Sequence, residues 1–287
     1  MTVQRNGAGS MVQRPVAPSV RLEHWSTRRT SLESKIDWAT LSLIPDATLL
    51  RDATENFILD FTNKSELVDS ALFLTATFAI DAYRDELFEL LSINFPEQLE
   101  NAVLKRRAEF LAGRVLAKIA IRHFSAVDGN LPVGPSRQPL WPQGLVGSLS
   151  HSRRHAVSIV SANSTMAIGV DVEAICSEEL SESISDVVLS LQERAFLKSF
   201  PENYCVLWTL AFSAKETLFK ALFPTVGNYF GFDCAKICGI DMQRRRLLLE
   251  LTMDLCETLQ HGAQFWIDFV LEEEVVMTFL LDPGTLR

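Results

Sequence analysis

The spacing of apolar residues along the chain predicts a mixture of strands and helices. From about residue 46 onward the pattern is that of a folded protein. Residues 70–83, SALFLTATFAIDAY, are rich in Phe, Thr and Ile and predict one or two strands. Residues 84–95 have helical apolar spacing. Residues 96–124 carry apolar side chains three and four positions apart among good helix formers, and they predict the best helix of the chain.

The second part of the chain has a similar order of elements. A loop with four prolines, 125–144, leads to three predicted strands at 145–150, 155–161 and 166–172. We expect an acidic, serine-rich loop with a helix start after them. Residues 205–224 predict a second good helix that stops at Pro224, and the tail from 234 to 281 predicts further strands.

Blocks of strands and helices in this order predict an α+β fold. The stretch ALFLTATFAID with its following helix and RRAEFLAGR resembles STMAIGVDVE with its following helix and SAKETLFKAL. We therefore expect two similar α+β halves, at 46–160 and 161–287, after a flexible N-terminal extension over 1–45.

Composition and charge narrow the possible functions. The chain is 47% hydrophobic, which is ample for a core, and its net charge of −9 argues against nucleic acid as the main partner. Five scattered cysteines indicate reduced thiols in the cytoplasm. No segment reaches the roughly 18 apolar residues of a transmembrane span, and the N-terminus lacks the apolar core of a signal peptide.

Two acidic residues close the third predicted strand. Asp171 and Glu173 are two positions apart, so both side chains leave the same face, whereas Val170 and Val172 face the core. Neighbouring carboxylates repel one another unless a cation lies between them, and Mg²⁺ or Mn²⁺ prefers oxygen ligands of this kind. The alternative is a solvated strand end, which is common.

The helix predicted over 205–224 carries charges on an otherwise apolar surface. Glu216 and Lys220 are one turn apart on one face, and Lys215 is adjacent in sequence. An ordinary surface ion pair is the simplest interpretation. However, the apolar context of LWTLAFSAKETLFKALF indicates that these charges need partners.

Ser150 and His151 allow two interpretations. A hydrolase triad is disfavoured because adjacent strand residues point to opposite faces, and no Gly-x-Ser-x-Gly turn surrounds them. Both residues fit better as donors to a phosphate. Four arginines could add positive charge for such an anion. The alternative is that they form a solvated basic face. They are Arg106, Arg107 and Arg114 on the long helix and Arg137 in the proline-rich loop.

Four stretches together resemble the Sfp superfamily of 4′-phosphopantetheinyl transferases, in its enterobactin-synthetase type. They are KRRAEFLAGR (105–114), GPSRQPLWPQGLVGSLSHS (134–152), IGVDVE (168–173) and FSAKETLFKA (212–221). The resemblance implies a cytoplasmic, monomeric enzyme of siderophore or secondary metabolism with its active site between the two halves. It would move the 4′-phosphopantetheine of coenzyme A to a serine of an acyl or peptidyl carrier protein and release adenosine 3′,5′-bisphosphate.

The resemblance also implies a role for each matching residue. Asp171, Glu173 and Glu216 would hold Mg²⁺, with Mn²⁺ as an alternative. Glu216, or a carboxylate-bound water, would take the proton of the carrier serine, and Lys220 would neutralise or protonate the leaving phosphate. The remaining residues would bind coenzyme A: Ser150, His151, Lys215, Arg106, Arg114 and Arg137.

Two other classes of function share these residues. A metal-dependent phosphohydrolase or nuclease would use the same carboxylates and cations without a carrier. A non-catalytic coenzyme A-binding module would keep only part of them. The sequence departs from many relatives at the start of the Lys-Glu motif, where Phe212-Ser213 replaces a Trp, and it does not identify the surface that docks the carrier.

Overall fold

The computed structural model describes residues 19–21, 54, 57–68, 70–125 and 129–282. Within the expected N-terminal extension over 1–45, only Ser19–Arg21 is described, and it forms strand β1. The rest of that extension lies outside the described residues. In the part of the chain that is described, no helix is long and apolar enough to cross a membrane.

The first half is a four-stranded antiparallel sheet covered by one long helix. The strand order is β2-β3-β5-β4. Along β3, alternate residues such as Leu74 and Phe78 pack toward the helix, and Phe73 packs on the opposite face. The elements are β2 (Ile58–Asn63), β3 (Leu72–Phe78), α2 (Glu86–Leu90), α3 (Leu104–Phe124), β4 (Val146–Ser152) and β5 (His155–Ser161).

The second half is a six-stranded sheet in the order β1-β7-β8-β9-β10-β6, with three helices on one face. The strand β1 pairs in parallel with β7, and the other neighbours are antiparallel. The elements are β6 (Ala167–Ala174), α4 (Glu178–Val188), α5 (Leu191–Lys198), α6 (Tyr204–Val226), β7 (Ala235–Asp241), β8 (Arg246–Leu251), β9 (Gln264–Leu271) and β10 (Val275–Asp282).

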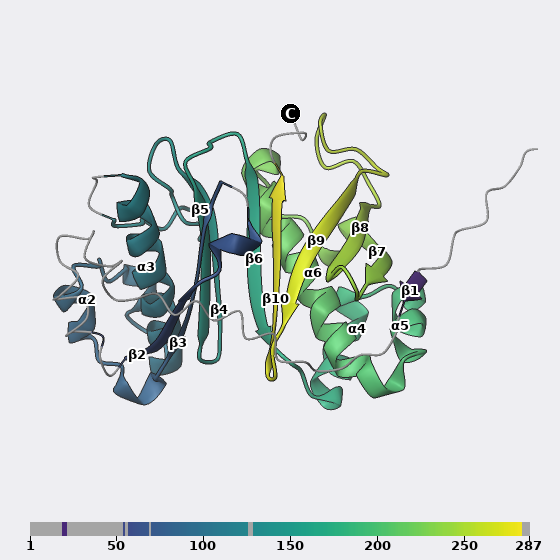
Figure 1. Cartoon of the computed structure of the whole chain (residues 1–287), viewed down its shortest axis with the longest axis horizontal. Coiled ribbons are helices and arrows are strands. Elements are labelled where there is room, and N and C mark those ends of the chain that lie inside the picture. Colours follow the sequence, from purple (N-terminus) through teal and green to yellow (C-terminus); the bar gives the residue numbers. More distant parts are fainter. Residues whose placement is uncertain (1–18, 22–53, 55–56, 69, 126–128, 283–287) are drawn as a thin grey trace, which may run out of the picture.

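The two sheets pack against each other between the two groups of helices (Figure 1). A third apolar cluster fills the space between them, and in it the rings of Phe73 and Phe279 lie 5.3 Å apart, edge to face. The chain passes from one sheet to the other between Ser161 and Ala167. The expected α+β fold with two halves is confirmed.

Several predicted boundaries were wrong. The helix predicted over 96–124 begins at Leu104, and Glu97–Leu99 form a short 3₁₀ turn instead. The helix predicted to stop at Pro224 continues to Val226, because a proline in the last turn forfeits only one backbone hydrogen bond. The helix ends at Gly227, whose φ of 72° is the left-handed conformation usual after a helix.

The acidic, serine-rich segment is more regular than expected. It forms two helices, α4 and α5, rather than a loop with one helix start. Serines begin both helices: the Ser177 hydroxyl accepts the N–H of Leu180, and the Ser190 hydroxyl accepts the N–H of Glu193. The Glu193 carboxylate in turn accepts the backbone N–H of Ser190, which completes a capping box. The serines therefore mark helix starts.

Candidate functional site

The site begins where β4 of the first sheet meets β6 of the second. Three serines at alternate positions of β4 each hydrogen-bond to β6, so their side chains join the two halves. The Ser148 hydroxyl accepts a backbone N–H, and the other two donate to carboxylates. The pairs are Ser148 with Val170 (3.1 Å), Ser150 with Asp171 (2.8 Å) and Ser152 with Glu173 (3.0 Å).

Asp171 is the centre of this junction. Its side chain is 2% exposed, and both carboxylate oxygens are hydrogen-bonded. Oδ1 accepts from the Ser150 hydroxyl and, at 2.7 Å, from the Lys220 ammonium, while Oδ2 accepts from the Ser213 hydroxyl at 2.7 Å. Lys220 also donates to the Ser150 hydroxyl at 2.9 Å. The predicted residues Asp171, Ser150 and Lys220 therefore form one cluster.

A glycine lets α6 approach β6 closely enough to form this cluster. A Cβ atom on Gly169 would lie 2.1 Å from the backbone oxygen of Thr217 and 3.0 Å from the Ala221 side chain. The same face of α6 is tied to β10, because the hydroxyls of Ser213 and Thr217 both hydrogen-bond to Thr278. The helix is thus held at a fixed distance from Asp171.

Two further carboxylates lie beside Asp171. Burial and the charge of Asp171 raise the pKa of Glu173 to about 8, although the Ser152 hydroxyl and Lys220 oppose the shift. Burial also raises the pKa of Glu216, with a further contribution from Asp171 and an opposing one from Lys220. Among the residues that the structure describes, no three His, Cys, Asp or Glu side chains converge into a ready metal cage.

The donor chemistry of these carboxylates nevertheless fits a hard divalent cation. Magnesium is usually held by one or two carboxylates together with waters and substrate phosphates, so it does not require a complete protein cage. The partly buried Glu173 and Glu216 would both be stabilised in their charged forms by a nearby cation.

A cationic group lies at the start of α3, next to β4. The exposed guanidinium of Arg106 donates from Nη1 to Nε2 of His151 at 3.0 Å. Nδ1 of His151 lies 3.7 Å from the buried Glu109 carboxylate, which also pairs with Lys105 at 3.7 Å. Burial and the charges of Arg106 and Lys220 lower the pKa of His151 to about 3, so the imidazole is neutral near pH 7.

The other predicted arginines have different surroundings. The guanidinium of Arg107 makes structural contacts, because it pairs with Asp85 at 2.6 Å and donates to two backbone carbonyls. Arg114 is buried with its guanidinium 4.4 Å from the centre of the Phe110 ring, and burial together with the charge of Arg106 lowers its pKa to about 10. Arg137 is exposed at a turn with a φ of 64°.

Lys215 does not join the cluster around Asp171. Its side chain is 3% exposed, and its ammonium pairs with Glu193 at 2.9 Å and donates to the backbone oxygens of Val188 and Phe232. Successive helix residues point about 100° apart, so Glu216 can face the site while Lys215 faces the interior. The ammonium of Lys215 is therefore used in structural contacts and is not among the proposed contacts to phosphate, although the side chain lines a cavity beside Glu216.

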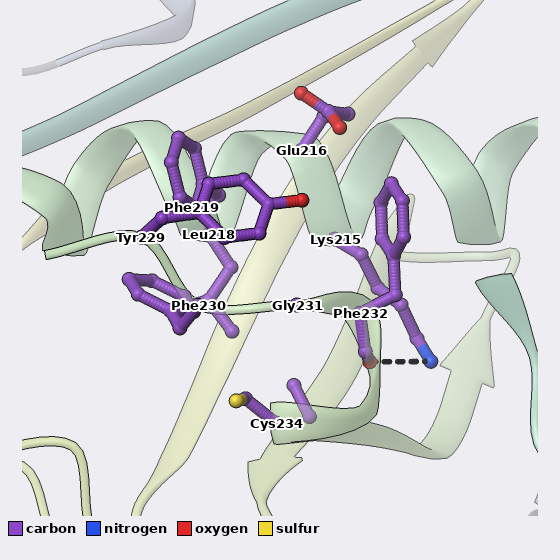
Figure 2. Close-up of a pocket in the computed structure, with 10 residues that line it drawn as sticks. Lys215, Glu216, Leu218, Phe219, Tyr229, Phe230, Gly231, Phe232 and Cys234 are labelled. Carbon is purple, nitrogen blue, oxygen red and sulfur yellow. Dashed lines mark hydrogen bonds between the residues drawn. The ribbon is translucent and has the colours of Figure 1, made fainter. Parts of the chain in front are cut away.

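An apolar cavity of about 100 Å³ opens beside Glu216, between α6 and the segment after it (Figure 2). The ring of Phe219 lies 5.5 Å from that of Tyr229 and 4.9 Å from that of Phe230. The cavity was not predicted from the sequence. The signal was the aromatic segment NYFGF (228–232), which follows the Lys-Glu helix in the sequence.

Comparison with known proteins places the site in a family. A model of the 4′-phosphopantetheinyl transferase N-terminal domain matches residues 95–161, and a model of the 4′-phosphopantetheinyl transferase superfamily matches residues 167–279. The first range contains the α3 arginines, Ser150 and His151. The second contains Asp171, Glu173, Glu216 and Lys220.

Individual relatives agree with these matches. Enterobactin synthase component D of Salmonella typhi is 38% identical over 155 residues, which are 53% of this chain and 63% of that protein. The Salmonella typhimurium protein of the same name is 35% identical over 165 residues, 57% of this chain and 67% of that protein. The 4′-phosphopantetheinyl transferase Npt of Nocardia iowensis is 30% identical over 156 residues, 50% of this chain and 69% of that protein.

The chain therefore belongs to the 4′-phosphopantetheinyl transferase superfamily. Within that superfamily it is of the enterobactin synthase component D type. The aligned region spans about two thirds of the length of these relatives.

Proposed function

We propose that the protein transfers the 4′-phosphopantetheine group of coenzyme A to a serine hydroxyl of an acyl or peptidyl carrier protein. The observation that carries the proposal is the cluster of Asp171, Ser150 and Lys220 at the junction of the halves, with Glu173 and Glu216 beside it. Cations and carboxylates at one junction suit a pyrophosphate substrate.

Lys220 and Arg106 would neutralise the phosphates of coenzyme A. Lys220 is held by Asp171 and Ser150 in a site from which water is partly excluded, where a positive charge stabilises a phosphate more strongly than in bulk water. Arg106 keeps donors for an anion, because only Nη1 is used by His151. Arg114 and Arg137 are the remaining candidates for the adenosine 3′-phosphate end.

Asp171, Glu173 and Glu216 would hold Mg²⁺, or Mn²⁺ in its place. When bound, the ion would neutralise charge on the pyrophosphate during the phosphoryl transfer. Asp171 already accepts from Lys220, so it has a cationic partner within the chain. Glu173 and Glu216 are the carboxylates with most to gain from the ion, since burial disfavours their charged forms.

Glu216 would receive the proton of the carrier serine, directly or through a water. The serine oxygen would form a bond to the phosphorus that carries pantetheine, and the phosphorus–oxygen bond to the nucleotide would break. Adenosine 3′,5′-bisphosphate would leave with the electron pair, next to Lys220. The cavity beside Glu216 would take part of the pantetheine chain, because its lining is mainly aromatic and aliphatic.

The test is to incubate the protein with coenzyme A, Mg²⁺ and several apo carrier proteins and to measure the intact mass of each carrier. We expect one carrier to gain the mass of phosphopantetheine, and we expect Asp171→Asn to abolish the gain. No gain with any carrier would contradict the proposal. Hydrolysis of coenzyme A without a carrier would indicate a phosphohydrolase, and binding without reaction would indicate a coenzyme A-binding module.

We also propose a siderophore or related secondary pathway, because two relatives are named enterobactin synthase component D. All five cysteines are free, as a reducing compartment requires. The cytoplasmic location and the monomeric state remain predictions, which fractionation and sedimentation of the full chain would test.

A further inference from the structure

Four buried side chains form one line of hydrogen bonds between α6, β10 and β6. Thr278 of β10 lies directly opposite Asp171 of β6, and opposite residues of an antiparallel pair point to the same face of a sheet. Ser213 and Thr217 are one turn apart on α6 and meet that face from the helix. The exposed fraction is 2% for Asp171 and 0% for each of the three hydroxyl residues.

The distances between the oxygen atoms give the order of the line. The Ser213 hydroxyl lies 2.7 Å from Oδ2 of Asp171 and 2.8 Å from the Thr278 hydroxyl. The Thr278 hydroxyl lies in turn 2.6 Å from that of Thr217. The order is therefore Thr217, Thr278, Ser213 and Asp171.

Each hydroxyl has a single proton, and this gives every bond a direction. The carboxylate of Asp171 only accepts, so Ser213 donates its proton to Oδ2. Because Ser213 then has no proton left, Thr278 must donate to Ser213, and by the same argument Thr217 donates to Thr278. All three protons point toward Asp171, and hydrogen bonds in a line of this kind strengthen one another.

The line gives the two oxygens of Asp171 different partners. Oδ2 is directed toward the buried hydroxyl of Ser213. Oδ1 accepts from the Lys220 ammonium at 2.7 Å, and the Lys220 side chain is 25% exposed. Oδ1 is therefore the oxygen on the side of the cation that we assign to the phosphates.

We propose that Thr278 is a positioning residue, which acts on the reaction only through Ser213 and Asp171. It keeps the Ser213 proton on Oδ2, and this bond keeps Oδ1 turned toward Lys220 and the divalent cation. The inference rests on the proposed function. Without the Thr278 hydroxyl, Ser213 is free to donate to the backbone carbonyl one turn earlier in α6, which is a common alternative for a serine inside a helix.

Two substitutions at Thr278 separate this role from simple packing between α6 and β10. Thr278→Val keeps the shape of the side chain and removes the hydroxyl, whereas Thr278→Ser keeps the hydroxyl and removes a methyl group. The valine variant should fold, because Thr217 still has the backbone oxygen of residue 278 as an acceptor at 3.1 Å.

The first measurement is the affinity for Mn²⁺ in the presence of coenzyme A, with the free ion followed by its electron paramagnetic resonance. Removing a group that supports a metal ligand lowers affinity by about 10–100-fold, which we expect for Ser213→Ala. Thr278 is one bond further from the carboxylate, so we expect a loss of about three- to tenfold for Thr278→Val. Thr278→Ser should retain the affinity of the unaltered protein. An equal loss in the serine and valine variants would overturn the proposal.

A double-mutant cycle tests whether Thr278 acts through Ser213. The affinity for Mn²⁺ is measured for Ser213→Ala, Thr278→Val and the double variant. If Thr278 acts through Ser213, the double variant binds Mn²⁺ within about twofold of Ser213→Ala alone. Losses that multiply in the double variant would show that the two residues act independently, and the proposal would be wrong.

The rate of carrier modification supplies a second readout. A high concentration of Mn²⁺ should restore most of the rate of Thr278→Val, because the variant weakens the hold on the ion and removes no ligand. A rate that stays low at saturating Mn²⁺ in a folded protein would contradict positioning. Thr75→Val is the matched control, because it makes the same change at a half-buried threonine on β3 of the other sheet. It should leave both the affinity and the rate unchanged.

The outcome also distinguishes this inference from the proposed function. If the unaltered protein neither binds Mn²⁺ with coenzyme A nor modifies a carrier, the proposed function itself fails. If it does both but Thr278→Val behaves like Thr75→Val, only the positioning role of Thr278 fails.

Discussion

The distance between β6 and α6 depends on the missing side chain at Gly169. A Cβ atom there would lie 2.1 Å from the Thr217 backbone oxygen, whereas ordinary contacts begin at 3.4 Å. Gly169→Ala therefore requires the helix to move outward by about 1.3 Å. The obstacle is backbone, so a change of side-chain rotamer cannot relieve it.

The displacement would lengthen the hydrogen bonds of Asp171, which lies two residues further along β6. Its bonds to Lys220 and Ser213 are both 2.7 Å long, and a shift of this size would break at least one of them. Overpacking costs about 1–3 kcal/mol, and a lost hydrogen bond to a charged group costs about 1.5–3 kcal/mol. We expect Gly169→Ala to lower the free energy of unfolding by about 3–5 kcal/mol.

The rate of carrier modification by Gly169→Ala should fall by more than the loss of folded protein alone would cause. A misplacement of about 1 Å at a catalytic group can reduce the rate about a hundredfold. The assay is urea unfolding followed by circular dichroism, together with the rate of carrier modification at a temperature where the variant is folded. Gly113→Ala is the matched control. Its Cβ would meet Leu149 at 3.5 Å, an ordinary contact, inside a helix that also packs on a strand.

We expect Gly113→Ala to be neutral or stabilising by up to about 1 kcal/mol, because alanine favours helix more than glycine. The reasoning about Gly169 would be refuted if its alanine variant were as stable and as active as the Gly113 control.

Three other predictions address separate parts of the molecule. Lys215→Met should destabilise the protein by about 3–5 kcal/mol, because it leaves the buried Glu193 carboxylate without its cation. His151 has a folded pKa of about 3, below its unfolded value, so its contribution to stability is complete above about pH 6.5 and is lost as the pH falls toward 3. Between pH 7 and pH 5, the unaltered protein should therefore lose about 2 kcal/mol more stability than His151→Phe. Tyr229→Ala should raise KM for coenzyme A about two- to tenfold with little change in stability, because the ring lines the cavity but is 80% exposed.

Each of these predictions has a control. Lys198→Met removes an exposed ion pair with Glu182 and should lower the free energy of unfolding by no more than about 1 kcal/mol. If Lys215→Met cost no more than this control, the expected role of the buried Lys215–Glu193 pair in stability would be contradicted. Parallel pH curves for His151→Phe and the unaltered protein in urea unfolding would show that His151 is not held neutral. Trp266→Ala removes an exposed ring on β9. If it raised KM as much as Tyr229→Ala, the cavity would not be the reason.

The alternation of apolar residues was enough to predict the strands that carry the site. It predicted β6 and the single face shared by Asp171 and Glu173, because side-chain direction in a strand depends only on position in the sequence. The same local logic predicted α6 and its Glu216–Lys220 face. It failed for α4 and α5, where serines were interpreted as a loop although they begin both helices.

The partners of the charged residues could not be predicted in the same way. Lys215 and Lys220 lie on one helix and were both assigned to phosphate. In the structure, Lys215 pairs with Glu193 of α5, and Lys220 pairs with Asp171 of β6. The difference arises from which neighbouring element packs against each face of α6, and no local pattern contains that information.

By itself, the sequence determined the strands and the helix that carry the site, the shared faces of Asp171 with Glu173 and of Glu216 with Lys220, and the motifs that identify the family. The tertiary structure alone decided that Ser150 bonds to Asp171 and Lys220, that His151 accepts from Arg106, and that Gly169 brings α6 against β6. The physical reason is the separation in sequence of the residues that decide each property. Side-chain direction depends on local backbone geometry. Hydrogen-bond partners and pKa values depend on segments far apart in the sequence that meet only when the two sheets pack together.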